Sequence, residues 1–311
     1  KVVPTIIFVS VLVNMFYHLG ILQRVVSFIG KGVHWLMGVS GAEALSNVAS
    51  TFVGQVEAQI MIKPYLKNMT NSELMASMTG SFACIAGGVM AVYISLGVPA
   101  AYLLAASLMA APGALVISKI MFPETEKSET EGEVKLELSK THANLVDAIA
   151  AGASEGLKVG MNVIAMLIGF IALIALVDLG LGHIGAWINY PELSMNTILG
   201  KVFSVFAFAM GVPAQDIEVA GALMGKKMVV NEFVAYLDMV HLKATLDPKT
   251  IAITSFALCG FANFSSVAIQ IGGIGELAPS RRSDLAKLGF KALIAGTLAS
   301  YLSATLAGLL L

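Results

Sequence analysis

Long apolar stretches, separated by short charged segments, run through the whole chain. No Asp, Glu, Lys or Arg occurs in the 45 residues between Glu73 and Lys119 or in the 26 residues between Lys249 and Glu276. Three further uncharged stretches hold 22, 19 and 20 residues, and the longest stretch has the turn signal GVP at 97–99 near its middle. A helix that crosses a membrane needs about 20 apolar residues, so the pattern predicts about six membrane-spanning helices.

The composition supports this interpretation and excludes several classes of protein. Of the 311 residues, 57% are hydrophobic and 13% are charged, against about 45–50% and about 25% in an average soluble domain. Too little charge remains to cover a soluble enzyme, and a net charge of −1 without a basic stripe excludes a nucleic-acid binder. The period-two alternation of a membrane β-barrel is absent. We therefore expect an all-α polytopic membrane protein in the plasma membrane or a bacterial inner membrane.

The two halves of the chain resemble each other. The sequence SFAC at 81–84 is echoed by SFALC at 255–259, and Glu57 and Glu232, each closely following an amide side chain, lie 175 positions apart. Matches at nearly the same offset indicate an internal duplication. An acidic linker at 123–142, in which Glu outnumbers Lys, separates the two halves.

Each half also has an uncharged stretch that is too short to span a membrane, with 13 residues after Glu43 and 14 residues after Lys201. Short, glycine-interrupted segments at matching places in two halves are typical of transporter binding sites, which use re-entrant hairpins and broken helices. We expect a scaffold helix at 1–30 and then a first repeat at 31–122, made of a hairpin at 31–67, a broken helix at 72–97 and a helix at 99–122. Interfacial and scaffold helices are expected at 143–190. A second, inverted repeat at 191–311 is expected to have a hairpin at 196–240, a broken helix at 250–276 and a helix at 283–311, and the two breaks should fall near 84–88 and 260–266.

Glu57 and Glu232 are the strongest candidates for binding residues. A carboxylate at mid-membrane depth costs about 2.5–3.5 kcal/mol on insertion scales, so it faces a cavity and has partners. With the amide that precedes each of them, the two carboxylates would form a site rich in hydrogen-bond acceptors, suited to a neutral, polyhydroxylated ligand. An ion pair with a neighbouring lysine, Lys63 or Lys227, is the alternative interpretation.

The predicted breaks would expose backbone carbonyls at membrane depth, where such groups commonly coordinate Na⁺ or handle H⁺. The sequence has no HExxH motif, no histidine pair at helical spacing, and no paired nucleophile and base within the spans. We therefore expect neither a cofactor nor an enzymatic activity. The first hairpin turn and the first break are expected to meet, and the cation candidates there are Ser50, Val53, Cys84 and Ile85.

Three glycine patterns resemble functional motifs or packing motifs. GLGHIG at 180–185 matches the dinucleotide fingerprint and GASEG at 152–156 matches the nucleophile elbow, but both motifs require a strand that is not predicted here. Gly152, Gly156 and Gly160 have the small-xxx-small spacing that allows two helices to approach closely. Helix packing is therefore the favoured interpretation.

Several of these segments resemble the concentrative nucleoside transporters. They are GQVEA at 54–58, IAGGV at 85–89, NEFVAY at 231–236 and SFALCGFANFSS at 255–266, of which NEFVAY and GFANFSS are specific. The similarity covers essentially the whole chain, which begins KVVP and is expected to be the later part of a longer protein. It implies a homotrimer with an elevator-like transport domain and nucleoside uptake driven by a cation gradient, usually of Na⁺.

The resemblance also implies roles for individual residues. The nucleobase would face Gln55, Val56 and Val89; the ribose or its surroundings would be served by Glu57, Glu232, Asn263 and Ser266; Phe261 would pack against the ligand; and the cation ligands would be the side chains of Ser50 and Cys84 with the carbonyls of Val53 and Ile85.

The chain departs from the family pattern at three positions. Ser50 and Cys84 stand where Na⁺-coupled members commonly have Asn and Ser, and a shorter hydroxyl and a thiol are poorer ligands for a hard cation. Coupling to H⁺ therefore stays open beside coupling to Na⁺. Val56 replaces the usual Thr or Ser, which removes a hydroxyl from the base pocket. A two-hairpin elevator transporter for another small polar solute is a further alternative. For acidic substrates such as dicarboxylates it should carry Arg or Lys at the broken helices, and none occurs between Lys249 and Glu276.

Overall fold

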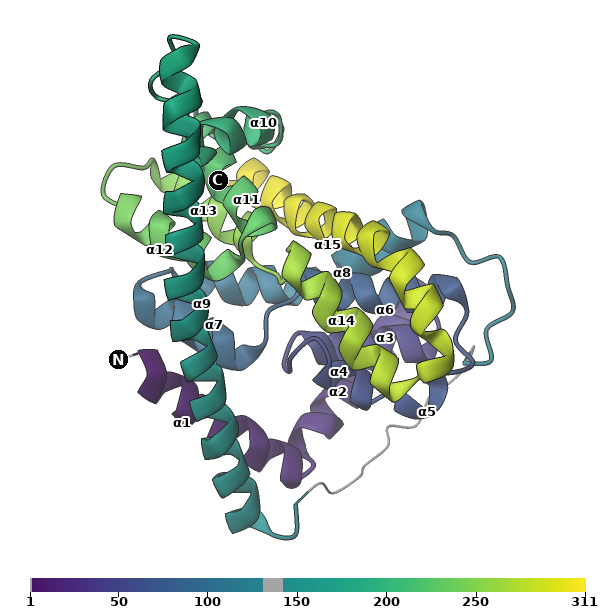
Figure 1. Ribbon diagram of the computed structural model, residues 1–311. Helices are drawn as coiled ribbons and strands as arrows, with labels where there is room; N and C mark the ends of the chain where they lie inside the picture. Colours follow the sequence, from purple (N-terminus) through teal and green to yellow (C-terminus); the bar gives the residue numbers. More distant parts are fainter. Residues whose placement is uncertain (1, 131–141) are drawn as a thin grey trace.

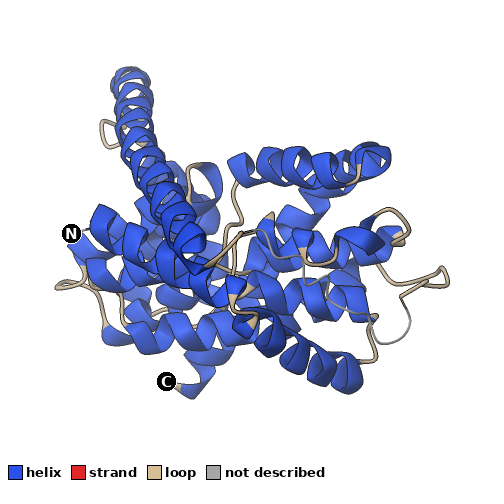
Figure 2. Ribbon diagram, turned by 90° about the horizontal axis from the view of Figure 1, so that it is seen from below, coloured by secondary structure: helices blue, strands red, loops and turns tan. Residues whose placement is uncertain are grey.

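The computed structural model describes residues 2–130 and 142–311. These residues form helices joined by loops, and no strand occurs among them (Figure 2). The prediction of an all-α protein is therefore confirmed. Most of the predicted acidic linker, from residue 131 onward, lies outside the described residues apart from its last position.

Two helices of the first half, α3 (Gly41–Ser50) and α6 (Asn71–Ala83), start with a recognisable local signal. Ser40 and Thr70 cap the helices that follow them, because each hydroxyl accepts a hydrogen bond from the backbone N–H of a glutamate three residues later, Glu43 or Glu73, in a reciprocal capping box. The helices of this half are α1 (Val2–His18), α2 (Ile21–Met37), α3 (Gly41–Ser50), α4 (Glu57–Ile60), α5 (Lys63–Leu66), α6 (Asn71–Ala83), α7 (Gly87–Leu96) and α8 (Ala100–Met121).

The second half has a similar order of elements: two helices, a hairpin, a broken helix and a final long helix. The inverted relation between the halves stays a prediction. The elements are α9 (Leu145–Trp187), α10 (Met195–Ala209), the short η1 (Ala214–Asp216), α11 (Ile217–Val229), α12 (Glu232–Leu242), α13 (Pro248–Leu258), α14 (Phe264–Leu277), η2 (Pro279–Arg281) and α15 (Arg282–Leu310).

The structure divides several predicted segments differently. Residues 1–30 do not form one scaffold helix, because Gly20 adopts a left-handed conformation (φ 71°) and α2 turns away from α1 by 75°. The segment 143–190 contains one helix, α9, rather than several. The helices that pair as hairpins begin at Gly41 and Ile217 rather than at 31 and 196, because the ends of the expected segments belong to the separate helices α2 and α10.

Fewer helices are long and apolar enough to cross a membrane than the sequence predicted. Within the described ranges, four segments qualify, one of which, Asn71–Leu96, is α6 together with α7, and a fifth qualifies if the bent pair α1 and α2 is taken as one span. The expected count of about six included the uncharged stretch after Lys249, which the structure splits into α13 and α14, neither of which is long enough alone.

Helix α9 stands upright along one side of the molecule, and α1 crosses its lower half (Figure 1). The glycines of α9 make this crossing close: a Cβ atom on Gly152 would lie 2.8 Å from Ser10 O, and one on Gly156 would lie 2.6 Å from Ile7 Cα. The small-xxx-small interpretation of these glycines is therefore confirmed.

Helix α15 connects the two halves by packing against α6, α8, α13 and α14 (Figure 1). Because α6 and α14 both lie against it, the first and the second broken helix are brought together. The break between α6 and α7 falls at 84–86 and that between α13 and α14 at 259–263, and both overlap the regions where the sequence placed them. These two interruptions form the centre of the candidate site.

Candidate functional site

The tip of the first hairpin, residues 51–56, rests on the first helix break. The backbone N–H of Gly87 donates to Phe52 O at 3.2 Å. The side chains continue this contact, because Ser50 Oγ lies 3.2 Å from Ser81 Oγ and Thr51 Oγ1 lies 3.9 Å from Cys84 Sγ. The C-terminal ends of α3 and α6 therefore meet, as the sequence predicted for the first hairpin turn and the first break.

The two broken helices also cross each other at their interruptions. Phe261 N donates to Cys84 O at 3.3 Å. Gly260 makes the crossing possible: its φ is +128°, and a Cβ atom there would lie 2.7 Å from the carbonyl oxygens of both Phe82 and Ala83. Both halves of the chain therefore contribute backbone to one small region.

A continuous hydrogen-bonded network joins the hairpin tip to the second half. Gln55 Nε2 approaches Ser266 Oγ at 3.5 Å, Ser266 N donates to Asn263 Oδ1 at 2.9 Å, and Asn263 Nδ2 donates to Glu232 Oε2 at 3.0 Å. Tyr93 OH donates to the other carboxylate oxygen, Glu232 Oε1, at 2.9 Å. Four of the predicted site residues thus lie in one network, and Tyr93 on α7 is a member that sequence reasoning missed.

Glu232 is a buried carboxylate at the first position of α12, with a relative exposure of 5%. The ring of Tyr93 packs against those of Tyr236 and Phe233, with centroids 4.5 and 5.8 Å away. Glu232 does not form the alternative ion pair with Lys227. Lys227 Nζ instead donates to Ala257 O at 2.9 Å and approaches a serine hydroxyl on α15. Glu232 instead accepts from neutral donors.

The remaining predicted ligand-binding residues lie around this network in different ways. Val89 and Phe261 are half-buried and pack against the same apolar core. Glu57 is exposed, and among the described residues no hydrogen bond or ion pair joins it to Glu232 or to Lys63. Of the two carboxylates that the sequence singled out, only Glu232 therefore takes part in the hydrogen-bonded network.

Helix α14 presents a polar and glycine-lined face to the hairpin tip. Gln270 Nε2 lies 3.3 Å from Gln55 Oε1 and 3.4 Å from Met78 O, and a Cβ atom on Gly273 would lie 2.5 Å from Val56 Cγ2. Sequence reasoning also missed Gln270. The only signal for it was a single amide in the apolar segment that follows SFALCGFANFSS.

Comparison with known proteins gives a consistent result. The family model described as "Na+ dependent nucleoside transporter C-terminus" matches residues 102–308, and a model described as "Nucleoside recognition" matches residues 1–100. The chain belongs to the concentrative nucleoside transporter family. It is thus a member of a family of membrane-embedded transporters.

Individual members of the concentrative nucleoside transporter family are similar over most of this chain. An uncharacterized transporter from Haemophilus influenzae is 49% identical over 99% of this chain and 75% of its own length. The nucleoside permease NupC of Helicobacter pylori is 41% identical over 99% of this chain and 74% of its own. Sodium/nucleoside cotransporter 1 of Rattus norvegicus is 40% identical over the whole chain and 50% of its own.

Solved structures share the fold in more than one conformation. CNTnw in an inward-facing substrate-bound state superposes with a TM-score of 0.94 and 43% identity, covering 99% of this chain and 74% of that one. A variant of CNTnw in an outward-facing state gives a TM-score of 0.93 at the same identity and coverage. The family therefore alternates between inward-facing and outward-facing states.

The predicted cation residues of this transporter are buried where α3 and α6 end. Ser50 and Cys84 have relative exposures of 2% and 1%, and Val53 and Ile85 are buried beside them. Two further hydroxyl groups that the sequence pattern did not indicate, those of Ser81 and Thr51, lie at the same place. Within the described ranges, no group of three or more His, Cys, Asp or Glu side chains is arranged to hold a metal ion.

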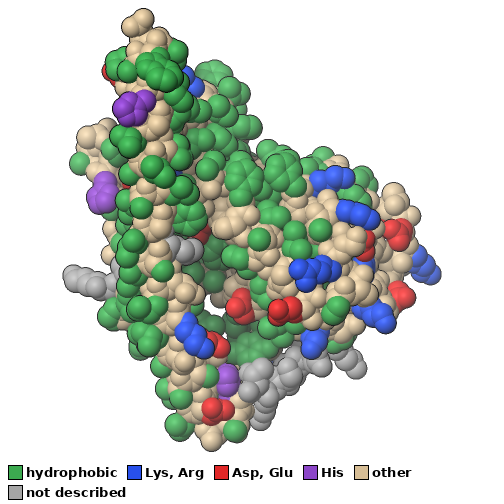
Figure 3. Space-filling view, in the orientation of Figure 1, with side chains coloured by type: hydrophobic (Ala, Val, Ile, Leu, Met, Phe, Trp, Pro, Cys, Tyr) green, Lys and Arg blue, Asp and Glu red, His purple; other side chains and the backbone are tan. Residues whose placement is uncertain are grey.

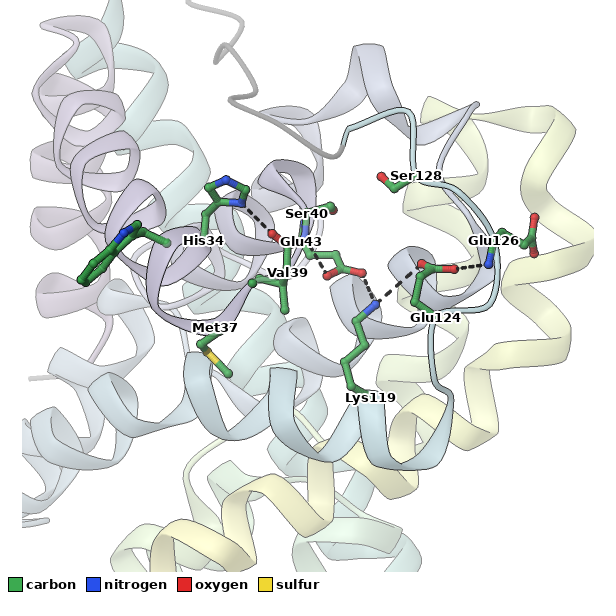
Figure 4. A pocket seen from close by; sticks show the side chains of 11 residues that line it. His34, Met37, Val39, Ser40, Glu43, Lys119, Glu124, Glu126 and Ser128 are labelled. Carbon is green, nitrogen blue, oxygen red and sulfur yellow. Dashed lines mark hydrogen bonds and ion pairs between the residues drawn. The ribbon is translucent and has the colours of Figure 1, made fainter.

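A separate pocket with charged groups at its wall lies at the other end of the first hairpin (Figure 4). It has a volume of about 520 Å³ and is lined by residues of α2, α3, α8 and the start of the linker. Glu43, 1% exposed, forms an ion pair with Lys119 at its wall, and Glu124 lies 3.8 Å from the same ammonium group. These contacts fasten the end of α8 and the linker to the hairpin base. A second hollow, beside α9, has acidic side chains at its edge (Figure 3).

The contact between Val56 and Gly273 can be tested by adding one methyl group. We expect Gly273→Ala to raise the KM for nucleoside uptake by about threefold to tenfold, because the new Cβ displaces Val56 and with it the hairpin tip. Transport kinetics in proteoliposomes would measure the effect. Gly272→Ala is the matched control, since no atom lies within 4 Å of a Cβ there.

Val56→Ala should restore the KM of the Gly273→Ala variant toward the wild-type value, because it removes the atoms that the new methyl group displaces. If Val56→Ala does not lower the KM of the Gly273→Ala variant, residues 56 and 273 are not in the contact described above.

Proposed function

We propose that the chain is a cation-coupled nucleoside symporter that moves nucleosides such as uridine into the cell across the plasma membrane or a bacterial inner membrane. It would work as a homotrimer by elevator-type alternating access. The observation that carries this proposal is the network from Gln55 through Ser266 and Asn263 to Glu232, which joins the tip of the first hairpin to the start of α12.

The chemistry of the network fits a nucleoside. A buried carboxylate accepts hydrogen bonds from ribose hydroxyls, and hydrogen bonds to charged groups contribute about 1.5–3 kcal/mol each. In our proposal Glu232, Asn263 and Ser266 serve the ribose. Phe261 packs against the ligand, and the exposed Glu57 completes the site from the hairpin tip. The base faces Gln55, Val56 and Val89.

The meeting of two helix ends supports a cation site at the first break. Helix C-termini carry partial negative charge and unpaired carbonyl oxygens, which favour a cation. At the corresponding end of α13 the chain supplies its own cation, since the ammonium group of Lys227 donates to Ala257 O. The side chains at the end of α6 are instead neutral: the hydroxyl groups of Ser50, Ser81 and Thr51 and the thiol of Cys84. We propose that Na⁺ takes this place, bound by Ser50, Val53, Cys84 and Ile85 with help from Thr51 and Ser81.

Proton coupling is the second candidate. Cys84 offers sulfur, a poor ligand for Na⁺, and Ser50 offers only a short hydroxyl. A proton would instead be carried by a carboxylate of the site. The dicarboxylate alternative is less compatible with the network, whose acidic member, Glu232, would repel an anionic substrate.

Alternating access follows from differential affinity. A ligand shifts a conformational equilibrium only if it binds one state more tightly than the other. Nucleoside and cation both contact the tip of the first hairpin in our proposal, so together they favour closure of the hairpins over the site. The loaded transport domain then crosses the membrane.

Uptake into proteoliposomes tests the substrate and the coupling ion together. We expect accumulation of labelled uridine when a Na⁺ gradient is imposed at fixed pH, and no accumulation of free bases or dicarboxylates. Uptake that responds only to a pH gradient would show that the coupling ion is H⁺ rather than Na⁺. Uptake of a dicarboxylate without uptake of any nucleoside would overturn the proposed substrate class.

A further inference from the structure

Gln270 is a fully buried amide on the face of α14 that meets the first hairpin. It follows Ser266 by four residues and precedes Gly273 by three, so all three lie on one side of the helix. Its relative exposure is 0%. Nothing in the site described above assigns it a role.

The surroundings of Gln270 determine which way its amide group points. Its Nε2 lies 3.4 Å from Met78 O, a backbone carbonyl that can only accept a hydrogen bond. The NH₂ group must therefore face α6. The same NH₂ group lies 3.3 Å from the side chain of Gln55, so the Gln55 atom on that side must be its acceptor, Oε1.

This contact also fixes the amide of Gln55. With Oε1 held by Gln270, the NH₂ group of Gln55 points to the opposite side, where Ser266 Oγ lies 3.5 Å away. A glutamine without such a partner can turn its amide over and offer either a donor or an acceptor. Gln55 is thereby limited to donating.

We infer that Gln270 is a positioning residue, which orients Gln55 as a hydrogen-bond donor toward the nucleobase. The site then recognises a base through an acceptor, a carbonyl oxygen or an unprotonated ring nitrogen. This inference rests on the proposed function, since it requires that Gln55 faces the base.

The other side of the Gln270 amide is consistent with a positioning role. Among the described residues, Gln270 Oε1 has no hydrogen-bond partner although it is buried. A buried polar atom without a partner destabilises the fold, so an apolar side chain of similar length would suit this position at least as well for stability alone. The donor side of the amide is what an apolar residue cannot replace.

The test compares Gln270→Met with the wild type in uridine uptake. We expect the KM to rise about threefold to tenfold, because Gln55 then spends part of its time with the wrong atom toward the base. The maximal rate should stay within about twofold, and thermal stability should be unchanged or higher. Gln23→Met is the matched control: Gln23 is also buried, donates to Tyr17 O at 2.9 Å and has a buried Oε1 without a partner in the described part of the chain, but it lies on α2.

A double-mutant cycle separates positioning from independent effects. In a Gln55→Leu background, Gln270→Met should raise the KM no further, since no amide remains to be oriented. Equal increases in both backgrounds, or no increase in the single variant, would overturn the inference.

A third variant makes the test independent of whether Gln270→Met folds. Gln55→Glu replaces the donor by an ionised group that only accepts, and it should raise the uridine KM more than about tenfold. Unchanged uptake by this variant would show that Gln55 does not donate. If the wild type itself takes up no nucleoside, the result contradicts the proposed function, and the inference about Gln270 falls with it.

Discussion

Glu232→Gln is expected to reduce uridine uptake by at least roughly 100-fold while the proposed trimer still assembles. The carboxylate accepts from Tyr93 OH through one oxygen and from Asn263 Nδ2 through the other. An amide has only one acceptor, so one of these donors would face an NH₂ group instead. The side chain would also lose the charge that strengthens its hydrogen bonds to ribose. Initial uptake rates in proteoliposomes and size-exclusion chromatography would measure the two parts of this prediction.

Glu276→Gln provides the matched control for this prediction. It makes the same chemical change on α14, but at an exposed position outside the network. We expect its uptake to stay within about twofold of the wild type, since surface substitutions usually change stability by less than about 0.5 kcal/mol. If the Glu232→Gln variant takes up uridine at the wild-type rate, Glu232 does not bind the ribose as proposed.

Much of the fold could be predicted from the sequence because membrane helices carry strong local signals. Uncharged stretches of fixed length identify apolar helices, and the glycines at 152, 156 and 160 identify the α1–α9 crossing. The boundaries of the hairpins could not be predicted as well. The apolar residues of α10 are continuous with those of the following loop, so composition alone does not separate this helix from the hairpin helix α11.

The candidate site could be predicted only in part, for a physical reason. Asn263, Ser266 and Glu232 lie in recognisable motifs, and the structure joins them in one network. Tyr93 and Gln270 are single polar groups on apolar helices, and their partners lie 139 and 215 residues away in sequence. Periodicity does not report contacts over such separations. Only packing of α7 against α12 and of α14 against the hairpin tip brings these partners together.

Lys119→Met is expected to destabilise the protein by about 3 kcal/mol, which corresponds to a fall in Tm of roughly 5–10 °C. Lys119 forms an ion pair with Glu43, which is 1% exposed, and its ammonium group also donates to Ser72 Oγ at 2.8 Å. Removing the lysine leaves a buried carboxylate without its counter-charge. Thermal unfolding of the purified protein in detergent would measure the effect, and Lys287→Met, at an exposed lysine of α15, is the matched control.

The double variant Glu43→Gln with Lys119→Met separates the cost of an unpaired charge from the loss of side-chain packing. The amide that Glu43→Gln introduces has no charge to compensate, and its carbonyl oxygen can still accept from Ser40 N at the start of α3, as the carboxylate of Glu43 does at 3.3 Å. We therefore expect the double variant to recover most of the stability that Lys119→Met loses. If the two substitutions simply add, the ion pair is not what fastens α8 to the base of the first hairpin. If the double variant is stable but transports more slowly, the same ion pair also constrains the hairpin during alternating access, because its two partners lie on α3 and on α8.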